Sequence, residues 1–285
     1  AESLSVAPGF KAELIYTVPK EDQGSWVSMT TDDKGRLITS DQYGGLYRIT
    51  PPGIGSSTGL KVEPLQTPLG GAHGLLYAFG SLYVMVTEPR AFASGLWRLR
   101  DTDGDDRFDE TKLLREMRGR GEHGVHALVL APDGRSIYFA NGNHTLLPER
   151  WETSRPVAWG EDHLLPRMWD ARNHARNVFA PGGYVGRTDP EGKQVDIFSI
   201  GFRNQYDIAF DGNGELFTYD SDMEWDQGTP WYIPTRIDHV VDGADFGWPS
   251  CYYDAMQMKQ VLAPEYGGDG GKAVGDCAMK DKPDM

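Results

Sequence analysis

Two short polar stretches carry side chains suited to acid–base and anion chemistry. In Glu122-His123 a carboxylate precedes an imidazole, whose ordinary pKa lies close to neutrality. In Arg203-Asn204 a permanent cation adjoins an amide that both donates and accepts hydrogen bonds. Apolar residues flank the second stretch, so we expect its polar groups at the rim of a packed scaffold, where binding sites often lie. Taken alone, each stretch also fits an ordinary surface turn.

A third stretch has the composition of a calcium-binding loop. Residues 101–109 read DTDGDDRFD, with acidic side chains at positions 1, 3, 5 and 9 of the loop. Alternating carboxylates suit a hard cation that prefers oxygen ligands. Asp106 stands where such loops usually carry glycine, and Lys112 replaces the last glutamate of an EF-hand. The alternative is a solvated acidic hairpin. The expected ligands are Asp101, Asp103, Asp105 and Asp109, with the carbonyl of Arg107.

A second acidic run, YDSDMEWD at residues 219–226, offers another set of oxygen ligands. Its carboxylates at Asp220, Asp222 and Glu224 are candidate ligands of a second calcium ion. A different polar ligand at this run, or none, is equally plausible.

The composition favours many short strands. The chain has 285 residues with 35 Gly and 18 Pro, and 11% of its residues are aromatic. A net charge of −14 argues against a nucleic-acid partner. We find no apolar run long enough for a membrane span and no signal-peptide pattern. Cys251 and Cys277 would pair in an oxidising compartment, or remain two independent thiols.

A repeat of strands and turns predicts the fold. Gly35, Gly80, Gly134 and Gly214 lie in similar tight turns and are separated by 45, 54 and 80 residues. The last interval contains an insertion, residues 146–181. About four strands per repeat indicate an all-β protein with four blades of a β-propeller; a β-sandwich is the alternative. The expected strands are 26–29, 36–40, 45–50, 60–65, 74–78, 82–87, 96–100, 111–117, 127–130, 136–140, 184–187, 195–200, 207–210, 215–219 and 236–240.

Blade topology predicts which loops meet. The tight turns within each blade would lie at one end, together with the acidic loop 101–109. The connections between blades, and the loops between second and third strands, would lie at the other end. Those segments carry Arg203 and four of the seven histidines. The histidines are His73, His123, His126 and His144.

The ends of the chain fit the repeat less well. Phe10–Val18 is an expected strand without an evident partner, unless it closes a ring. After Trp248 the blade pattern stops. We therefore expect a fragment of a ring whose closing blades lie beyond Met285. The insertion, rich in aromatic residues, is a candidate lid or docking surface, and residues 251–285 form an irregular tail. The expected blades are 20–70, 71–120, 121–202 and 203–250.

Three motifs together resemble the soluble quinoprotein sugar dehydrogenase superfamily of six-bladed propellers. They are GFRNQ at 201–205, Glu122-His123 followed by APDG at 131–134, and RID at 236–238 followed by FGWP at 246–249. The sorbosone-dehydrogenase-like branch is the most similar. Weaker similarity extends from Pro8 to about Cys277.

The resemblance implies a chemistry and a set of roles. Pyrroloquinoline quinone (PQQ) and calcium would be the cofactors, and a sugar or related alcohol or aldehyde would be oxidised. His123 matches the base that removes the hydroxyl proton, and Glu122 would orient it. Arg203 and Asn204 match residues at the polar edge of the cofactor. His73 stands near a position where relatives carry glutamine.

Partners and location follow only from this resemblance. A small sugar or polyol would be the substrate, a cytochrome or another carrier would accept electrons, and the protein would be periplasmic or secreted. Two alternatives stay open. One is a non-catalytic propeller that binds carbohydrate or protein. The other is a calcium-dependent hydrolase of the lactonase type, which would use metal-bound water.

Overall fold

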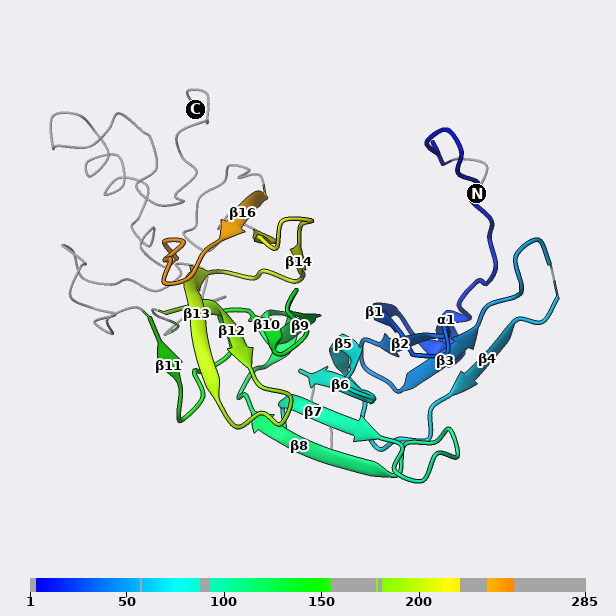
Figure 1. The fold of residues 1–285 in the computed structure, drawn as a ribbon, viewed down its shortest axis with the longest axis horizontal. Helices are drawn as coiled ribbons and strands as arrows, with labels where there is room; N and C mark the ends of the chain where they lie inside the picture. Colours follow the sequence, from blue (N-terminus) through cyan, green and yellow to red (C-terminus); the bar gives the residue numbers. More distant parts are fainter. Residues whose placement is uncertain are drawn as a thin grey trace, which may run out of the picture.

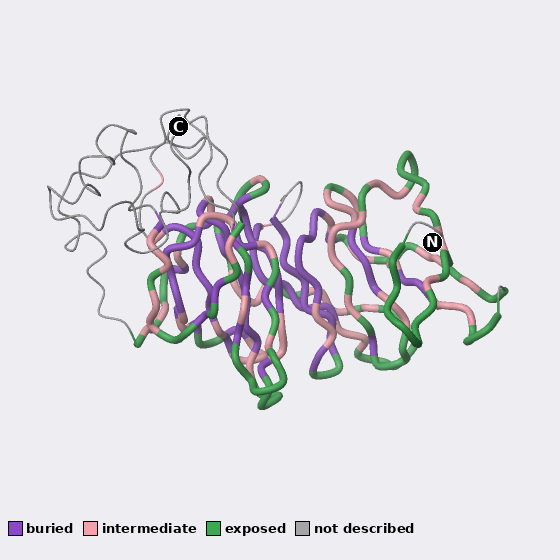
Figure 2. Tube along the Cα trace, turned by 90° about the horizontal axis from the view of Figure 1, so that it is seen from above, coloured by how far each residue is buried: buried purple, intermediate pink, exposed green. Residues whose placement is uncertain are grey.

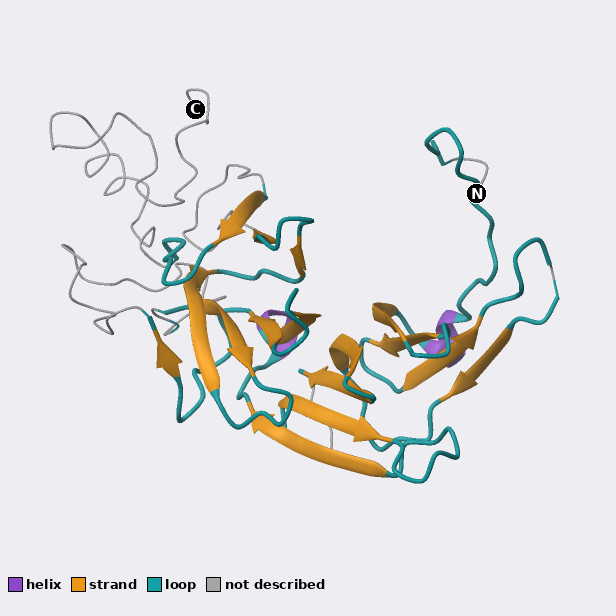
Figure 3. Cartoon of the chain, in the orientation of Figure 1, coloured by secondary structure: helices purple, strands orange, loops and turns teal. Residues whose placement is uncertain are grey.

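Four sheets follow one another along an arc in the computed structural model (Figure 1). The structure describes residues 4–56, 58–87, 93–154, 178, 181–220 and 235–248. Within these ranges helix is limited to α1, Lys20–Gln23, and the single 3-10 turn η1, Gly121–His123 (Figure 3). The predicted all-β class is therefore confirmed.

Each sheet is an antiparallel meander, to which sheet three adds one short parallel strand. Sheet one consists of β1 (Trp26–Thr31), β2 (Leu37–Asp41), β3 (Leu46–Thr50) and β4 (Lys61–Pro64). Sheet two consists of β5 (Ala72–Ala78), β6 (Ser81–Val86), β7 (Gly95–Arg100) and β8 (Glu110–Glu116). Sheet three contains β9 (Val125–Leu130), β10 (Ile137–Asn141), β12 (Gly183–Thr188) and β13 (Val195–Phe202). Sheet four contains β14 (Ile208–Phe210), β15 (Leu216–Asp220) and β16 (Arg236–Val240). All these strands lie where the repeat predicts them.

One further strand comes from the insertion. β11, Glu152–Thr153, pairs in parallel with β13 and extends the outer edge of sheet three. Ser154 Oγ donates a 2.6 Å hydrogen bond to Asp242, which ties this edge to the segment after β16. Most of the proposed lid lies outside the described residues.

The recurring turn explains why the strands begin and end where they do. The glycine in each β-hairpin turn has a positive φ, between 63° and 87°, which a residue with a Cβ adopts only with strain. In the first and fourth sheets an aspartate also accepts hydrogen bonds from two amides of the turn. The four glycines are Gly35, Gly80, Gly134 and Gly214.

The core lies between the sheets. All six positions of β6 are buried, although alternate side chains of a strand point to opposite faces. One apolar cluster joins sheets one and two, a second joins sheets two and three, and a third joins sheets three and four. Figure 2 shows this buried material in the middle of the molecule and exposed residues at the loop tips. A sandwich of two sheets would leave one face of each sheet in water, so the propeller arrangement is confirmed.

The prediction of a strand at Phe10–Val18 is wrong. The structure shows no strand between Phe10 and Pro19, and the side chains of Phe10 and Leu14 are 77% and 73% exposed. The apolar pattern is present, but no described strand lies beside this segment to satisfy its amide and carbonyl groups. Only its end is anchored, where the rings of Tyr16 and Trp26 stack at 5.6 Å.

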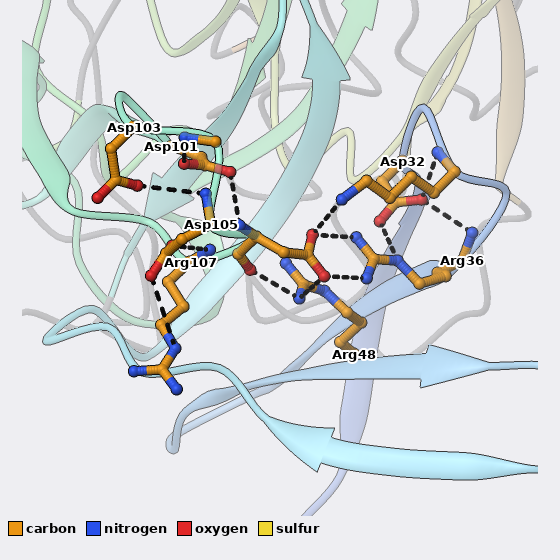
Figure 4. A network of polar contacts seen from close by, with 10 residues as sticks. Asp32, Arg36, Arg48, Asp101, Asp103, Asp105 and Arg107 are labelled. Carbon is orange, nitrogen blue, oxygen red and sulfur yellow. Dashed lines mark hydrogen bonds and ion pairs between the residues drawn. The ribbon is translucent and has the colours of Figure 1, made fainter.

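Charged side chains join sheets one and two at the end that carries the tight turns (Figure 4). Asp106, in the loop between β7 and β8, accepts hydrogen bonds from Arg36 (2.5 and 2.7 Å) and Lys34 (2.7 Å). Its carboxylate also lies 3.3 Å from Arg48. These contacts explain why aspartate, and not glycine, occupies a position with a φ of 73°. They also lower the pKa of Asp106, chiefly through the hydrogen bonds with Arg36.

Asp106→Asn tests this ionic contact while keeping a residue that tolerates positive φ. We expect the free energy of unfolding at pH 7 to fall by about 1 kcal/mol, since the carboxylate is partly exposed and partly screened. A lowered pKa means that the stabilisation is present above the unfolded pKa of about 3.9 and disappears as the pH falls below it. Urea unfolding at neutral and acid pH measures both effects.

Asp133→Asn serves as the control, because Asp133 is an exposed turn carboxylate that accepts from the amide of Arg135 at 2.9 Å. A difference between Asp106→Asn and the parent that persisted undiminished in acid would contradict the ionic explanation.

Candidate functional site

His123 lies at the end of η1, immediately before β9, and is 2% exposed. Two glycines shape this turn: Gly121 has a φ of 61°, and the amide of Gly124 donates to its carbonyl at 3.1 Å. A Cβ on Gly124 would collide with Thr87, so the turn is pressed against the end of β6. The imidazole is thereby held by backbone geometry, not by a flexible loop.

Asn143 is the partner of His123. Its Oδ1 lies 2.6 Å from Nδ1 of His123, and an amide oxygen can only accept, so Nδ1 carries the proton. The other ring nitrogen, Nε2, is then the basic one in the neutral ring. The ring of His144 stacks on that of His123 at 4.7 Å.

The loop that carries Asn143 also joins the two predicted polar stretches. The amide of Asn143 donates to the carbonyl of Arg203 at 2.8 Å, and the amide of His144 donates to the carbonyl of His123 at 3.1 Å. A Cβ placed on Gly142 would lie 2.6 Å from the His123 carbonyl and 2.7 Å from Oδ1 of Asn204. The base-bearing turn and the Arg203-Asn204 turn therefore meet at the same end of the sheets, as the topology predicts.

A buried carboxylate shapes the Arg203-Asn204 turn. Asp220, at the end of β15, is fully buried and accepts from the amides of Arg203 (2.8 Å) and Asn204 (2.7 Å). Arg236 Nη2 lies 3.2 Å from the same side chain. Burial raises the pKa of Asp220, while Arg236 and the two amides oppose that shift. Asp220 thus positions the turn with both carboxylate oxygens.

His73 and His126 form a second pair of stacked imidazoles, 6.0 Å apart, beside Tyr206. His73 lies in β5 and is 4% exposed. Burial, and then the neighbouring His126, lower the pKa of His73 to about 4, so its ring is neutral at physiological pH. Tyr206 reaches across to sheet one, where its hydroxyl donates to the carbonyl of Val27 at 3.3 Å.

Several buried polar atoms at this end have no hydrogen-bond partner among the described residues. Native interiors rarely leave such atoms unpaired, and a cluster of them points to a polar ligand or to water. They include both ring nitrogens of one histidine and both amide atoms of one glutamine. The atoms are Nδ1 and Nε2 of His73, Oδ1 of Asn141, Nδ2 of Asn143, Oδ1 of Asn204, and Oε1 and Nε2 of Gln205.

The acidic loop 101–109 lies at the other end, beside the turn between β1 and β2 (Figure 4). One carboxylate oxygen from each of Asp101, Asp103 and Asp105 lies within 4.8 Å of the others, which is a spacing suited to a shared cation. The carboxylate of Asp109 instead accepts from Thr102, through both its amide (2.7 Å) and its hydroxyl. The amide of Arg107 donates to Asp105 at 2.8 Å.

Some predicted residues do not enter this description. Asp222 and Glu224 lie outside the described residues, as do Cys251 and Cys277. The second calcium site therefore stays a prediction. Glu122 is exposed, and its backbone carbonyl, not its side chain, makes the contact described below with His126.

Three contributors were missed from the sequence: Asn143 as the partner of His123, Gln205 as a buried amide, and His126 as a link between turns. Each acts on a residue 4 to 79 positions away in the chain. All three fall at the end that the blade topology predicts, His126 as one of its four histidines, Gln205 within GFRNQ and Asn143 within NGNH, but the sequence assigned none of them a partner.

Comparison with known proteins identifies solved structures of similar fold. No protein-family description matches this chain, and no curated protein sequence does. Among solved structures, a Trichoderma reesei protein of carbohydrate-active enzyme family AA12 is 16% identical to this chain and has a TM-score of 0.59. The match covers 86% of this chain and 59% of the Trichoderma protein. Its calcium structure gives 14% identity and a TM-score of 0.56, and the match covers 86% of this chain and 60% of that protein. A Thermus thermophilus protein described as a candidate oxidoreductase (glucose dehydrogenase) is 18% identical, with 78% and 64% coverage and a TM-score of 0.50.

The chain shares the fold of these structures. The chain spans about three fifths of the length of each of these structures. No helix among the described residues is long and apolar enough to cross a membrane.

Asp220→Asn tests whether the buried carboxylate shapes the turn. Asparagine would present an amide NH2 group to one of the two backbone amides that Asp220 now accepts from, so we expect a loss of about 2 to 3 kcal/mol in the free energy of unfolding. Asp189→Asn is the matched control, because both carboxylate oxygens of Asp189 also accept from backbone amides (2.7 and 2.8 Å), but in a turn that is only half-buried. Urea unfolding should show a much smaller loss for the control. Equal losses would contradict the role of burial.

Proposed function

We propose that this protein belongs to the quinoprotein oxidoreductases and oxidises a sugar or related alcohol or aldehyde with PQQ and calcium. The observation that carries the proposal is the meeting of His123, Asn143 and the Arg203-Asn204 turn at one end of a sugar dehydrogenase propeller. The three sequence motifs point in the same direction. A small sugar or polyol as substrate, a separate electron acceptor such as a cytochrome, and a periplasmic or secreted location belong to the same proposal.

The side chains present fit such a cofactor. PQQ is a flat anionic ring that offers carbonyl and carboxylate oxygens as acceptors. The matching donors are the buried Nε2 of Gln205 and Nδ2 of Asn143, with the cationic Arg203 nearby. His73, neutral and buried, adds one ring N–H and one bare nitrogen. Donor atoms that lack partners inside the protein are the atoms a polar ligand would satisfy.

His123 is the residue suited to remove the substrate's hydroxyl proton. Its Nδ1–H donates to Asn143, which fixes the ring and leaves the lone pair on Nε2. Arg203, held by the buried Asp220, provides positive charge for an oxyanion. When bound, PQQ would supply the acceptor for the hydride that leaves the substrate carbon. Burial of the imidazole excludes water and keeps the base oriented.

His123→Gln tests the base. The amide has no basic lone pair, so we expect kcat to fall by about 10²- to 10⁴-fold with the protein still folded. The measurement is the reduction of a redox dye by a panel of sugars after addition of PQQ and calcium. The control is His239→Gln, because His239 is an exposed histidine of β16 paired with Glu215.

Full dye reduction by His123→Gln would refute the assignment of the base. A parent protein that hydrolyses lactones but reduces no dye would replace the proposal with the hydrolase alternative.

The loop 101–109 is proposed as a structural calcium site, since it lies at the end away from His123. We expect calcium to raise the Tm of the parent by about 5 °C at a concentration about one hundred times the Kd. Asp103→Asn should abolish this shift, whereas Asp133→Asn, in another exposed turn, should keep it. Thermal unfolding with calcium and with a chelator measures the shift. A parent Tm that is unchanged by calcium would contradict the proposed calcium site.

A further inference from the structure

His126 is a buried histidine whose two ring nitrogens both face carbonyl oxygens. It is 0% exposed and lies at the second position of β9. Its Nε2 is 2.9 Å from the carbonyl of Glu122, and its Nδ1 is 2.8 Å from the carbonyl of Gln205. Glu122 immediately precedes the proposed base, His123. Gln205 ends the turn that carries Arg203 and Asn204.

Carbonyl oxygens only accept hydrogen bonds, so both contacts are hydrogen bonds only when both ring nitrogens carry protons. We propose that His126 is a positioning residue that spans the base-bearing turn and the cofactor-binding turn: the neutral ring donates to one carbonyl, and the protonated ring donates to both. This inference rests on the proposed function for the roles of the two turns. It assigns His126 a role that neither the motifs nor the fold relationship supplies.

The two ring contacts of His126 position two different parts of the site. A shift of the Glu122 carbonyl would move His123, whose ring must stay aligned with Asn143 at 2.6 Å. A shift of the Gln205 carbonyl would move the turn that Asp220 holds through two amides. The loop carrying Asn143 also joins the two turns, through the backbone amides of Asn143 and His144 and through the side chain of Asn143. His126 joins them through a single rigid ring.

The surroundings of the ring determine what a second proton costs. Burial is the largest influence and lowers the pKa of His126 below its ordinary value although the two carbonyls oppose that shift, so the second proton binds only at acid pH. The ring of His73 stacks at 6.0 Å and is neutral, with a pKa of about 4. The ring of Tyr206 lies 4.8 Å away, and burial raises its pKa to about 12, so it too is uncharged. The two carbonyls and the aromatic face of Tyr206 are therefore the groups that stabilise an imidazolium here.

Two substitutions each remove one of the two ring contacts of His126 and keep the other. The amide nitrogen of glutamine reaches approximately the place of Nε2, so His126→Gln keeps the contact with Glu122 and loses the one with Gln205. The shorter asparagine reaches approximately the place of Nδ1, so His126→Asn keeps the contact with Gln205 and loses the one with Glu122. The exposed His239→Gln is the control.

The two variants should fail in different ways. We expect His126→Gln to raise the Kd for PQQ by about three- to tenfold, with kcat at saturating PQQ close to that of the parent. We expect His126→Asn to lower kcat by about three- to tenfold, with the Kd close to that of the parent. Equal effects of both variants on both quantities would show a merely structural residue and overturn the proposal. So would a variant indistinguishable from the parent.

A measurement that does not depend on enzyme activity tests this inference separately from the proposed function. In the parent protein labelled with 15N at histidine, an NMR titration toward acid pH should show His126 take up its second proton with both nitrogens hydrogen-bonded while the protein stays folded. The resonance is assigned by its loss in His126→Gln. A His126 that takes up no second proton in the folded protein would overturn the two-ended contact even if PQQ binds and sugars are oxidised. Protonation of both nitrogens in a protein that binds no PQQ would keep the two-ended contact and refute the proposed function.

Discussion

Burial of both faces of the inner sheets is the constraint on which the rest of this structure depends. A sheet such as β5–β8, apolar on both sides, is stable only between two neighbours, so the sheets follow one another around an arc. That arrangement brings all tight turns to one end and all connections between sheets to the other. The candidate site is a consequence of this packing, because His73, His123 and Arg203 come from three different sheet boundaries.

The two ends then acquire different chemistry. At one end a loop of carboxylates lies beside cationic side chains of the neighbouring sheet, and the residue that joins them, Asp106, adopts a backbone conformation usual for glycine. At the other end imidazoles, amides and one buried carboxylate are packed with little exposure to water. Charge at the first end stabilises the contact between two sheets. At the second end, buried hydrogen-bonding groups without a partner among the described residues are available to a polar ligand.

Much of the fold could be predicted from the sequence because its signals are local. A glycine that needs a positive φ, an aspartate that accepts from the amides of its own turn, and alternating apolar residues all act within a few positions. The strand expected at Phe10–Val18 failed for the same reason, because alternation shows what a strand would bury and not whether a partner is there. The site was predicted in part. His123 and Arg203 stand in recognisable motifs, whereas Asn143, Gln205 and His126 matter through contacts between distant segments that no local pattern encodes.

A crystal structure of the protein grown with PQQ and calcium tests the central claim most directly. The account predicts the quinone at the end of the arc where the loops of His123, Asn143 and Arg203 meet, with acceptor oxygens on the amide groups of Asn143 and Gln205 and on His73. Quinone bound at the opposite end beside Asp106, or a histidine-bearing end that stays free of quinone at saturating concentration, would contradict it.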